Sequence, residues 1–178
     1  MSVLCYPRLL ASARCASLLG VNPDEKPHFG VMPRLSCQRN LIDTTEVDAR
    51  IGDLLMEAKL TEADFQSAPQ ARLERFVDWR DVFAPEDLPR TASGAFSGYQ
   101  LVRGALAAHA VGGRFCVVCD ARRLDLREQW LAVIRAVRSY ELRCRLTLLT
   151  WQELSAAAPS ALQSWLSEKY GILPAPHR

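Results

Sequence analysis

Hydrophobic and polar residues alternate most regularly between residues 45 and 62, where the pattern predicts two short β-strands joined by a tight turn. Gly52-Asp53 is the predicted turn, because Gly adopts a positive φ without a Cβ clash and Asp tolerates the left-handed region. The second strand then has two distinct faces. Leu54, Met56, Ala58 and Leu60 share the hydrophobic face, and Leu55, Glu57, Lys59 and Thr61 share the other.

The turn also fixes which residues of the two strands face each other. Counting outward from Gly52-Asp53 places Asp48 opposite Glu57. Glu46 then falls opposite Lys59, so three carboxylates and one ammonium share a face. Opposed residues have Cβ atoms about 5 Å apart, and like charges at that distance destabilise a strand pair. We therefore expect a positive group between Asp48 and Glu57, and a hard divalent cation suits carboxylate oxygens.

The remaining pattern predicts an α/β fold, a mixed sheet of four to five strands with helices on both faces. The second half alternates strand and helix, which implies right-handed crossovers and parallel strands, whereas the first half is a hairpin meander. We expect an N-terminal helix within residues 1–20, one domain over 21–172 and a tail over 173–178. The predicted elements outside the hairpin are a helix over 8–19 stopped by Gly20, a strand over 30–37, a helix over 67–84, a linker over 85–98, a helix over 99–110, a strand over 114–120, a helix over 124–139, a strand over 145–150, and a helix that starts at the capping box Thr150–Glu153, breaks at Pro159 and stops at Gly171.

Composition agrees with an ordinary soluble globular protein, since 49% of the 178 residues are hydrophobic and 24% are charged. The sequence has no run of 18 apolar residues, so we expect no membrane-spanning segment. Residues 1–23 contain no acid and superficially resemble a transit peptide, but an amphipathic helix is the preferred interpretation. Six scattered cysteines favour a reducing compartment, and we predict a cytoplasmic protein.

The cysteines do not show the spacing of a metal site. Cys116-Val-Val-Cys119 is the one CxxC motif, and it lies in an apolar run that predicts a buried strand. Residues i and i+3 of a strand point to opposite faces, whereas a zinc or redox site would need a second pair or a strand-to-helix turn. We predict that both are buried structural cysteines.

Charge is distributed unevenly along the chain. Residues 24–87 hold 14 of the 20 acidic residues, while residues 103–145 hold nine arginines against four acids. An acidic hairpin followed by a basic segment favours a metal site beside a groove for a polyanion. The alternative is that Arg is simply this chain's usual cation, since it has 19 Arg and three Lys. Because Lys is so rare in this chain, its presence at position 59 indicates a site where a compact ammonium is needed.

The hairpin carries the groups that metal-assisted phosphodiester hydrolysis requires. Two carboxylates, Asp48 and Glu57, can hold a cation that activates water. Lys59 follows Glu57 on the same face, about 7 Å along the strand, where it can orient that water or stabilise developing charge. An acid-x-Lys pair is common on solvated strand faces, and the register is what strengthens the prediction.

Asp48 followed by Glu57-Ala58-Lys59 at the end of an adjacent strand resembles the PD-(D/E)xK motif of the restriction-endonuclease-like nuclease superfamily. The segments LTEADF, YQLVRGALAA, LTWQEL and LSEKYGI resemble a bacterial subgroup of restriction-endonuclease-like proteins, so the resemblance covers roughly residues 20–172. It implies the same mixed sheet flanked by helices. Val47 stands where the motif name has Pro.

The resemblance also implies roles for individual residues. Asp48, Glu57 and the Ala58 carbonyl would bind Mg²⁺, with Mn²⁺ as an alternative, and Lys59 would position the attacking water. Many members carry a further Glu on the first helix, which has no acid here, so Glu46 or Glu25 substitutes for it or that ligand is absent. A polar residue on the helix after the strands supports the site in the superfamily, and Gln100, with Arg103 one turn on, matches that place.

The other candidates are weaker. Arg122 or Arg123, after the predicted central strand, could contact a phosphate. His28, His109 and His177 lack metal spacing and are expected at or near the surface. Trp79, Trp130, Trp151 and Trp165 occupy apolar helix positions typical of a core.

The sequence therefore predicts a Mg²⁺-dependent endonuclease acting on DNA. Base contacts would come from loops or from the second subunit of a homodimer, because nothing resembles a helix-turn-helix or a zinc finger. The alternatives are a catalytically silent nucleic-acid-binding or assembly module with the same fold, and a structural partner protein.

Overall fold

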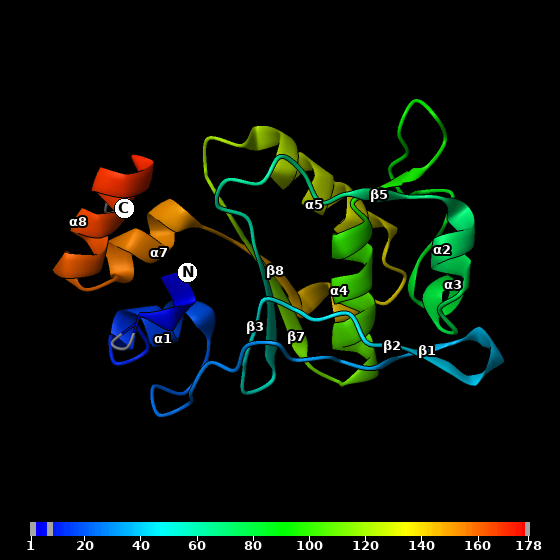
Figure 1. Cartoon of the computed structure of the whole chain (residues 1–178), viewed down its shortest axis with the longest axis horizontal. Coiled ribbons are helices and arrows are strands. Elements are labelled where there is room, and N and C mark those ends of the chain that lie inside the picture. Colours follow the sequence, from blue (N-terminus) through cyan, green and yellow to red (C-terminus); the bar gives the residue numbers. More distant parts are fainter. Residues whose placement is uncertain (1–2, 7–8, 177–178) are drawn as a thin grey trace.

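A four-stranded mixed sheet forms the centre of the computed structural model, which describes residues 3–6 and 9–176. Its strand order is β3-β4-β7-β8 (Figure 1). β3 runs antiparallel to β4, whereas β4, β7 and β8 are parallel to one another. The predicted mixed sheet flanked by helices is confirmed. Its strands are β3 (Ala49–Ile51), β4 (Leu54–Ala58), β7 (Arg114–Cys119) and β8 (Leu146–Thr150).

Helices and short strand pairs surround this sheet. Two small sheets, β1-β2 and β5-β6, lie outside it. These elements are η1 (Val3–Cys5), α1 (Ala13–Leu19), β1 (Leu35–Cys37), η2 (Gln38–Asn40), β2 (Leu41–Asp43), β5 (Ser67–Ala68), α2 (Gln70–Glu74), α3 (Trp79–Val82), β6 (Phe96–Ser97), α4 (Tyr99–Ala110), α5 (Leu124–Ala136), α6 (Tyr140–Cys144), α7 (Trp151–Ala157) and α8 (Ser160–Tyr170).

The β3–β4 hairpin has the predicted turn and register. Gly52 has a φ of 56°, a left-handed conformation that glycine adopts without strain. Pairing proceeds outward from Ile51 and Leu54 and ends at Ala49 and Met56. Asp48 lies just beyond that last pair, and its N–H still donates to the Met56 carbonyl at 3.2 Å. The expected pairing of Glu46 with Lys59 is wrong, because the ladder ends before it.

The carboxyl ends of three strands meet at one edge of the sheet. Ala58 of β4 is level with Val118 of β7, and Val118 is level with Leu149 of β8. The residues that directly follow these strands therefore converge at the same edge, as expected for parallel pairing. This edge carries the C-terminal part of the hairpin motif.

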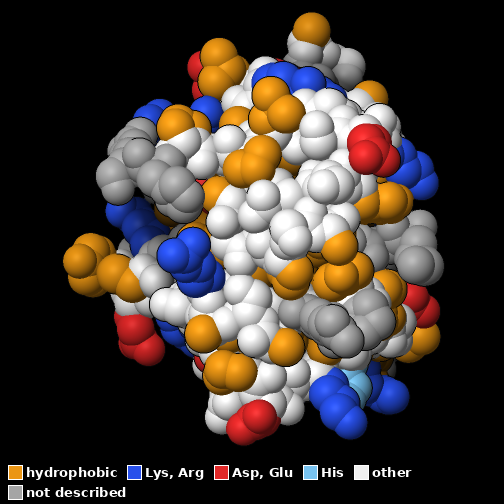
Figure 2. All heavy atoms as spheres, turned by 90° about the vertical axis from the view of Figure 1, so that its left-hand side faces the viewer, with side chains coloured by type: hydrophobic (Ala, Val, Ile, Leu, Met, Phe, Trp, Pro, Cys, Tyr) orange, Lys and Arg blue, Asp and Glu red, His pale blue; other side chains and the backbone are white. Residues whose placement is uncertain are grey.

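One face of the sheet is covered by α1, α7 and α8, which form what we call the α7-side core (Figure 1). Leu54 and Met56 point into it, as does Cys116. Figure 2 shows the outer face of this layer. Cys119 points into the opposite core, so the prediction of buried cysteines on opposite faces is confirmed. Burial raises the pKa of both the Cys116 and the Cys119 thiol to about 11, which leaves them protonated and unreactive.

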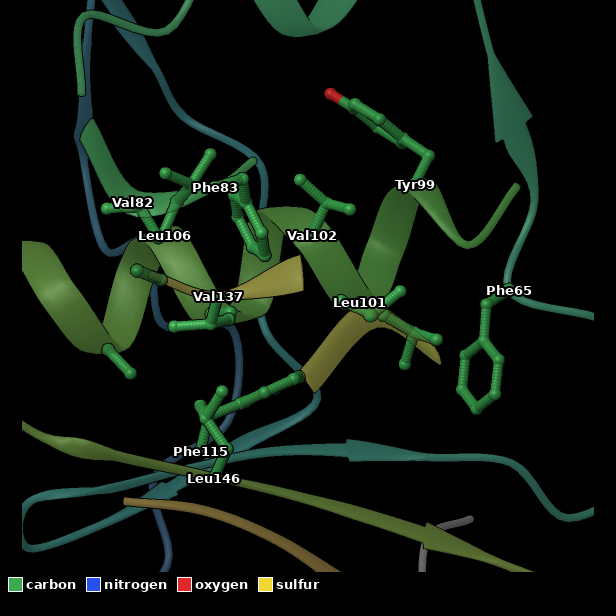
Figure 3. Packing of buried hydrophobic residues seen from close by; sticks show 14 of the residues in the cluster. Phe65, Val82, Phe83, Tyr99, Leu101, Val102, Leu106, Phe115, Val137 and Leu146 are labelled. Carbon is green, nitrogen blue, oxygen red and sulfur yellow. The ribbon is translucent and has the colours of Figure 1, made fainter. Parts of the chain in front are cut away.

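The other face is covered by α4 and α5, and α4 makes the closest approach (Figure 3). Phe115 of β7 points up toward α4 and is fully buried. Its ring also meets Trp130 of α5 edge-on at 5.5 Å. Gly104 is what permits this packing, because a Cβ there would lie 2.1 Å from the Phe115 ring.

Gly104→Ala is therefore expected to destabilise the fold by about 1–3 kcal/mol, since the buried Phe115 ring would have to shift to make room for the added methyl group. Urea unfolding followed by far-UV circular dichroism measures this difference. The double variant Gly104→Ala, Phe115→Leu should lose less free energy of unfolding than the sum of the losses in the two single variants. A Gly104→Ala protein as stable as the wild type would contradict the packing.

Some predicted elements are wrong in the first half of the chain. The helix expected over 67–84 is instead β5, α2 and α3. Its continuity is lost because Phe76 bridges Cys37 and the Val77 N–H donates to Ser36 at 3.1 Å, so this backbone pairs with β1. The strand expected over 30–37 is reduced to β1 and an isolated bridge from Val31 to Val47.

The N-terminal helix is shorter than predicted. The predicted start at Arg8 falls outside the described residues, and α1 begins only after Ser12. The Ser12 hydroxyl accepts from the Cys15 N–H at 3.4 Å, which caps the helix there. Gly20 ends it in the left-handed conformation, as predicted.

The second half agrees more closely. The α4 helix has the predicted bounds, and β7 and α5 differ only at their last residues. The α7 capping box, the break at Pro159 and the Gly171 stop are all present. The strand predicted over 145–150 is only half-buried, because β8 is an edge strand. The short helix α6 and the pair β5-β6 were not predicted.

Within the described part of the chain, no helix combines the length and apolar character needed to cross a membrane.

Candidate active site

Glu57, Lys59 and Gln100 meet where β4 ends against the first turn of α4. The Glu57 Oε1 atom lies 3.0 Å from the Lys59 Nζ and accepts from the Gln100 amide at 2.8 Å. Both Glu57 and Lys59 are buried, with exposed fractions of 3% and 7%. The strand periodicity places Glu57 and Lys59 on one face, and α4 covers that face. The structure thus brings together three of the residues that the sequence singles out.

The environment of Glu57 disfavours its negative charge. Burial raises the pKa of this carboxyl, and the neighbouring Asp48 charge raises it further. The Lys59 ammonium lowers the pKa of Glu57, as does Arg103 more weakly, but the net direction is upward. A raised carboxyl pKa beside a second carboxylate is the electrostatic pattern that an additional cation would relieve.

Asp48 is the exposed member of the group. Its Oδ2 atom accepts a hydrogen bond from the Ala58 N–H at 2.7 Å, which holds the carboxylate against the end of β4. The bond ties Asp48 to the residue that directly follows Glu57, and the Asp48 charge adds to burial in raising the pKa of Glu57. Asp48 therefore presents a carboxylate oxygen to solvent beside a buried carboxylate.

The backbone and the side chain of Lys59 are both held by contacts with other residues. Its N–H continues the β4–β7 pairing by donating to the Val118 carbonyl at 2.8 Å. Its own carbonyl accepts from the Trp151 indole N–H at 2.7 Å. The ammonium lies 5.6 Å from the centre of the Phe65 ring, a cation–π distance. Trp151 and Phe65 were not predicted as site residues, although the capping box that starts α7 places Trp151 at the same sheet edge.

Arg103 fixes the segment that leads to Asp48. It is 3% exposed, and its guanidinium donates to the Thr45 carbonyl at 3.1 Å and to the Glu46 carbonyl at 2.8 Å. The predicted supporting residues on α4 thus act at two places. Gln100 contacts Glu57 directly, and Arg103 binds the backbone upstream of Asp48.

The acids proposed as a third ligand lie elsewhere. Glu25 sits over the hairpin turn, because a Cβ on Gly52 would come within 2.5 Å of its carboxylate. That turn is at the opposite end of β4 from Glu57. The Glu46 carboxylate lies beside Gly30, where a built Cβ would be 3.6 Å away. Among residues 3–6 and 9–176, no group of three or more His, Cys, Asp or Glu side chains is arranged to hold a metal ion.

The oxygen donors at the site nevertheless fit one hard cation. Both contacts of Glu57 use Oε1, and in the described structure its Oε2 has no hydrogen bond. The Oε1 atom of Gln100 is buried and has no partner within the described residues. A buried polar atom without a partner needs a ligand or water. Two carboxylates with neutral oxygens suit Mg²⁺, which keeps several waters in its coordination shell.

Arg122 and Arg123 lie at the end of β7 and are engaged within the chain. Arg122 binds the Asp120 carboxylate and the Tyr170 carbonyl. Arg123 binds Asp125 and the Glu62 carbonyl. Their expected contact with a phosphate would have to compete with these bonds.

The remaining candidates are placed as expected where the structure describes them. His28 and His109 are exposed, and His177 lies outside the described residues. Trp79, Trp130 and Trp151 are buried in the cores, and Trp165 is partly buried.

Comparison with known proteins adds one finding. A family model described as "Restriction Endonuclease associating with ARP" matches residues 1–171. No curated protein and no solved structure matches the chain.

Proposed function

The chain belongs to the family described as restriction endonuclease associating with ARP, and from this membership we propose that it is a metal-dependent nuclease that hydrolyses phosphodiester bonds in DNA. The observation that supports this most directly is the contact of Glu57 with both Lys59 and Gln100, beside the exposed Asp48. A buried carboxylate, a fixed ammonium and an exposed carboxylate together suit polyanion chemistry better than a purely structural role.

The proposed cation site uses oxygen atoms only. Asp48 and Glu57 would hold Mg²⁺ or Mn²⁺ together with the Ala58 carbonyl, which follows Glu57 directly. The cation supplies Lewis-acid stabilisation of the negative charge that develops on the phosphate. Burial is the main reason for the raised pKa of Glu57, and neutralising both carboxylates would remove the Asp48 repulsion that adds to it.

Lys59 and Gln100 prepare the site for the attacking water. In this hydrolysis a water oxygen bonds to phosphorus, one P–O bond breaks, and the departing sugar oxygen gains a proton. The Lys59 ammonium is held by Glu57 and Phe65, so it can orient the water and stabilise charge without reorganising. Gln100 holds Glu57 from the α4 side and fixes the orientation of that carboxylate.

The direct test is cleavage of supercoiled plasmid DNA by the full chain. We expect nicked and linear products with Mg²⁺ or Mn²⁺, and no products with EDTA, because the two carboxylates need a cation to approach a phosphate. Restoring Mg²⁺ after EDTA treatment should restore cleavage. Equal cleavage in EDTA and in Mg²⁺ would contradict the metal-dependent reaction.

The alternative is a catalytically silent module that binds nucleic acid or an assembly partner. The observation favouring it is that, among the residues that the structure describes, the site has two carboxylates and not the third acid that many superfamily members have. Isothermal titration calorimetry separates the two functions. DNA binding without Mg²⁺ binding at Asp48 and Glu57 would favour the silent module.

A further inference from the structure

A second feature, with both apolar and charged lining residues, lies at the same sheet edge beyond β7 and β8. It is an open groove of about 1280 Å³ bordered by α1, α7 and the C-terminal segment. Figure 2 shows the face that carries these helices, and on it the acidic side chains lie toward the margin. The charged and amide side chains that line the groove are Arg14, Arg122, Arg127, Gln152 and Glu153.

Two of these side chains carry charge without a partner. In the described part of the chain, neither the Arg14 nor the Arg127 guanidinium has an ion pair or a hydrogen bond. The Arg127 Nε atom is also buried, so its missing partner is costly. A buried, unpartnered guanidinium N–H at a groove needs an acceptor from outside the chain.

The other charged groups of the groove already have hydrogen-bond partners within the chain. Arg122 is bound to Asp120. The Glu153 carboxylate accepts from the Thr150 N–H at 2.8 Å and from the Thr150 hydroxyl at 2.7 Å, as part of the helix cap. Arg14 and Arg127 therefore outweigh the one lining carboxylate without a described ion pair, Glu153, and the groove keeps a net positive charge.

The groove is close to the candidate active site. Trp151 donates to the Lys59 carbonyl, and its neighbours Thr150 and Gln152 line the groove. The end of β8 is two strands away from the end of β4, roughly 10 Å at the usual strand spacing. A polynucleotide strand that passes the end of β4 can therefore reach the end of β8, where Thr150 and Gln152 line the groove, within a few nucleotides.

We propose that this groove binds the phosphates of the polynucleotide strand that leads away from the candidate active site, with Arg14 and Arg127 as the contacting residues. This proposal rests on the nuclease function proposed above. Guanidinium groups bind phosphate oxygens strongly, and such contacts position a nucleic acid without reading its sequence. A groove of this size and openness suits a chain of nucleotides better than one small anion.

The test is the salt dependence of DNA binding by the full chain in EDTA. Fluorescence anisotropy of a labelled 20-base-pair duplex measures the binding constant K at each salt concentration. Arg14→Gln and Arg127→Gln should each reduce the slope of log K against log salt by about 1, and the double variant by about 2. The double variant should bind on the order of tenfold more weakly at moderate salt. The matched control is Arg135→Gln, an exposed position on the same helix as Arg127 that does not line the groove.

The outcomes separate the groove from the nuclease function. If both groove variants have the same slope as Arg135→Gln and their melting curves are unchanged, the groove proposal is overturned. This holds even if metal-dependent cleavage is intact. Reduced slopes without any cleavage by the wild type would support the groove and overturn the nuclease. A nucleoside monophosphate that binds with the same dependence on Arg14 and Arg127 would overturn the assignment to a polynucleotide.

Discussion

Asp48→Asn is expected to reduce metal-dependent DNA cleavage by roughly a hundredfold or more, because it removes the exposed carboxylate of the proposed cation site. The fold should be almost unaffected. The asparagine carbonyl can still accept from the Ala58 N–H, which is the one hydrogen bond that the Asp48 side chain makes in the described structure. Initial rates of plasmid nicking at saturating Mg²⁺ measure the loss.

Two comparisons make this result specific. Asp87→Asn changes the same chemistry at an exposed loop position that has no ion pair with any described residue, and it should cleave at the wild-type rate. Glu46→Gln tests whether another exposed acid near the hairpin takes part, and its position beside Gly30 leads us to expect little change. An Asp48→Asn protein as active as Asp87→Asn would remove Asp48 from the site.

Lys59→Met should have the largest effect on stability, about 3–5 kcal/mol at neutral pH, because it leaves the buried Glu57 carboxylate without its counter-ion. The methionine side chain fits the space beside Phe65, so lost packing contributes little. Cleavage should fall as well, since no ammonium remains to act on the water. Chemical denaturation in EDTA at several pH values measures the stability.

The pH dependence identifies the cause. A carboxyl whose folded-state pKa is raised contributes stability below its unfolded pKa, and this contribution is lost as the pH rises through the folded pKa. Without Lys59 the pKa of Glu57 rises further, so the deficit of Lys59→Met should be small at acidic pH and largest above neutrality. Adding Glu57→Gln should recover most of that deficit. A deficit that is independent of pH, and is not recovered by Glu57→Gln, would show that lost packing is responsible.

The sequence predicted well what depends on neighbouring residues. The hairpin register follows from a two-residue turn, and it places Asp48 just beyond the last pair, where its carboxylate accepts from the Ala58 N–H. Parallel strands could be inferred from the alternation of strand and helix in the second half. Helix stops at Gly20 and Gly171 follow from the left-handed conformation that glycine adopts easily.

Other features depend on pairing between distant segments and could not be predicted from local pattern. The backbone of Phe76 and Val77 pairs with β1, which overrides the helical periodicity of 67–84. Lys59 is held by Trp151 through a contact that local pattern does not encode. The domain limits, the homodimer and the cytoplasmic location remain predictions.

The hydrogen bonds that hold the candidate active site together form in sequence as the chain is synthesised. The bond from Ala58 to Asp48 spans 10 residues, the bond from Gln100 to Glu57 spans 43, and the bond from Trp151 to Lys59 spans 92. Local contacts close first, because long loops cost more entropy to close. A chain still attached to the ribosome can therefore form the hairpin, but it cannot hold Lys59 in place until α7 has emerged. The centre is therefore completed only after the residues of α7 have been synthesised.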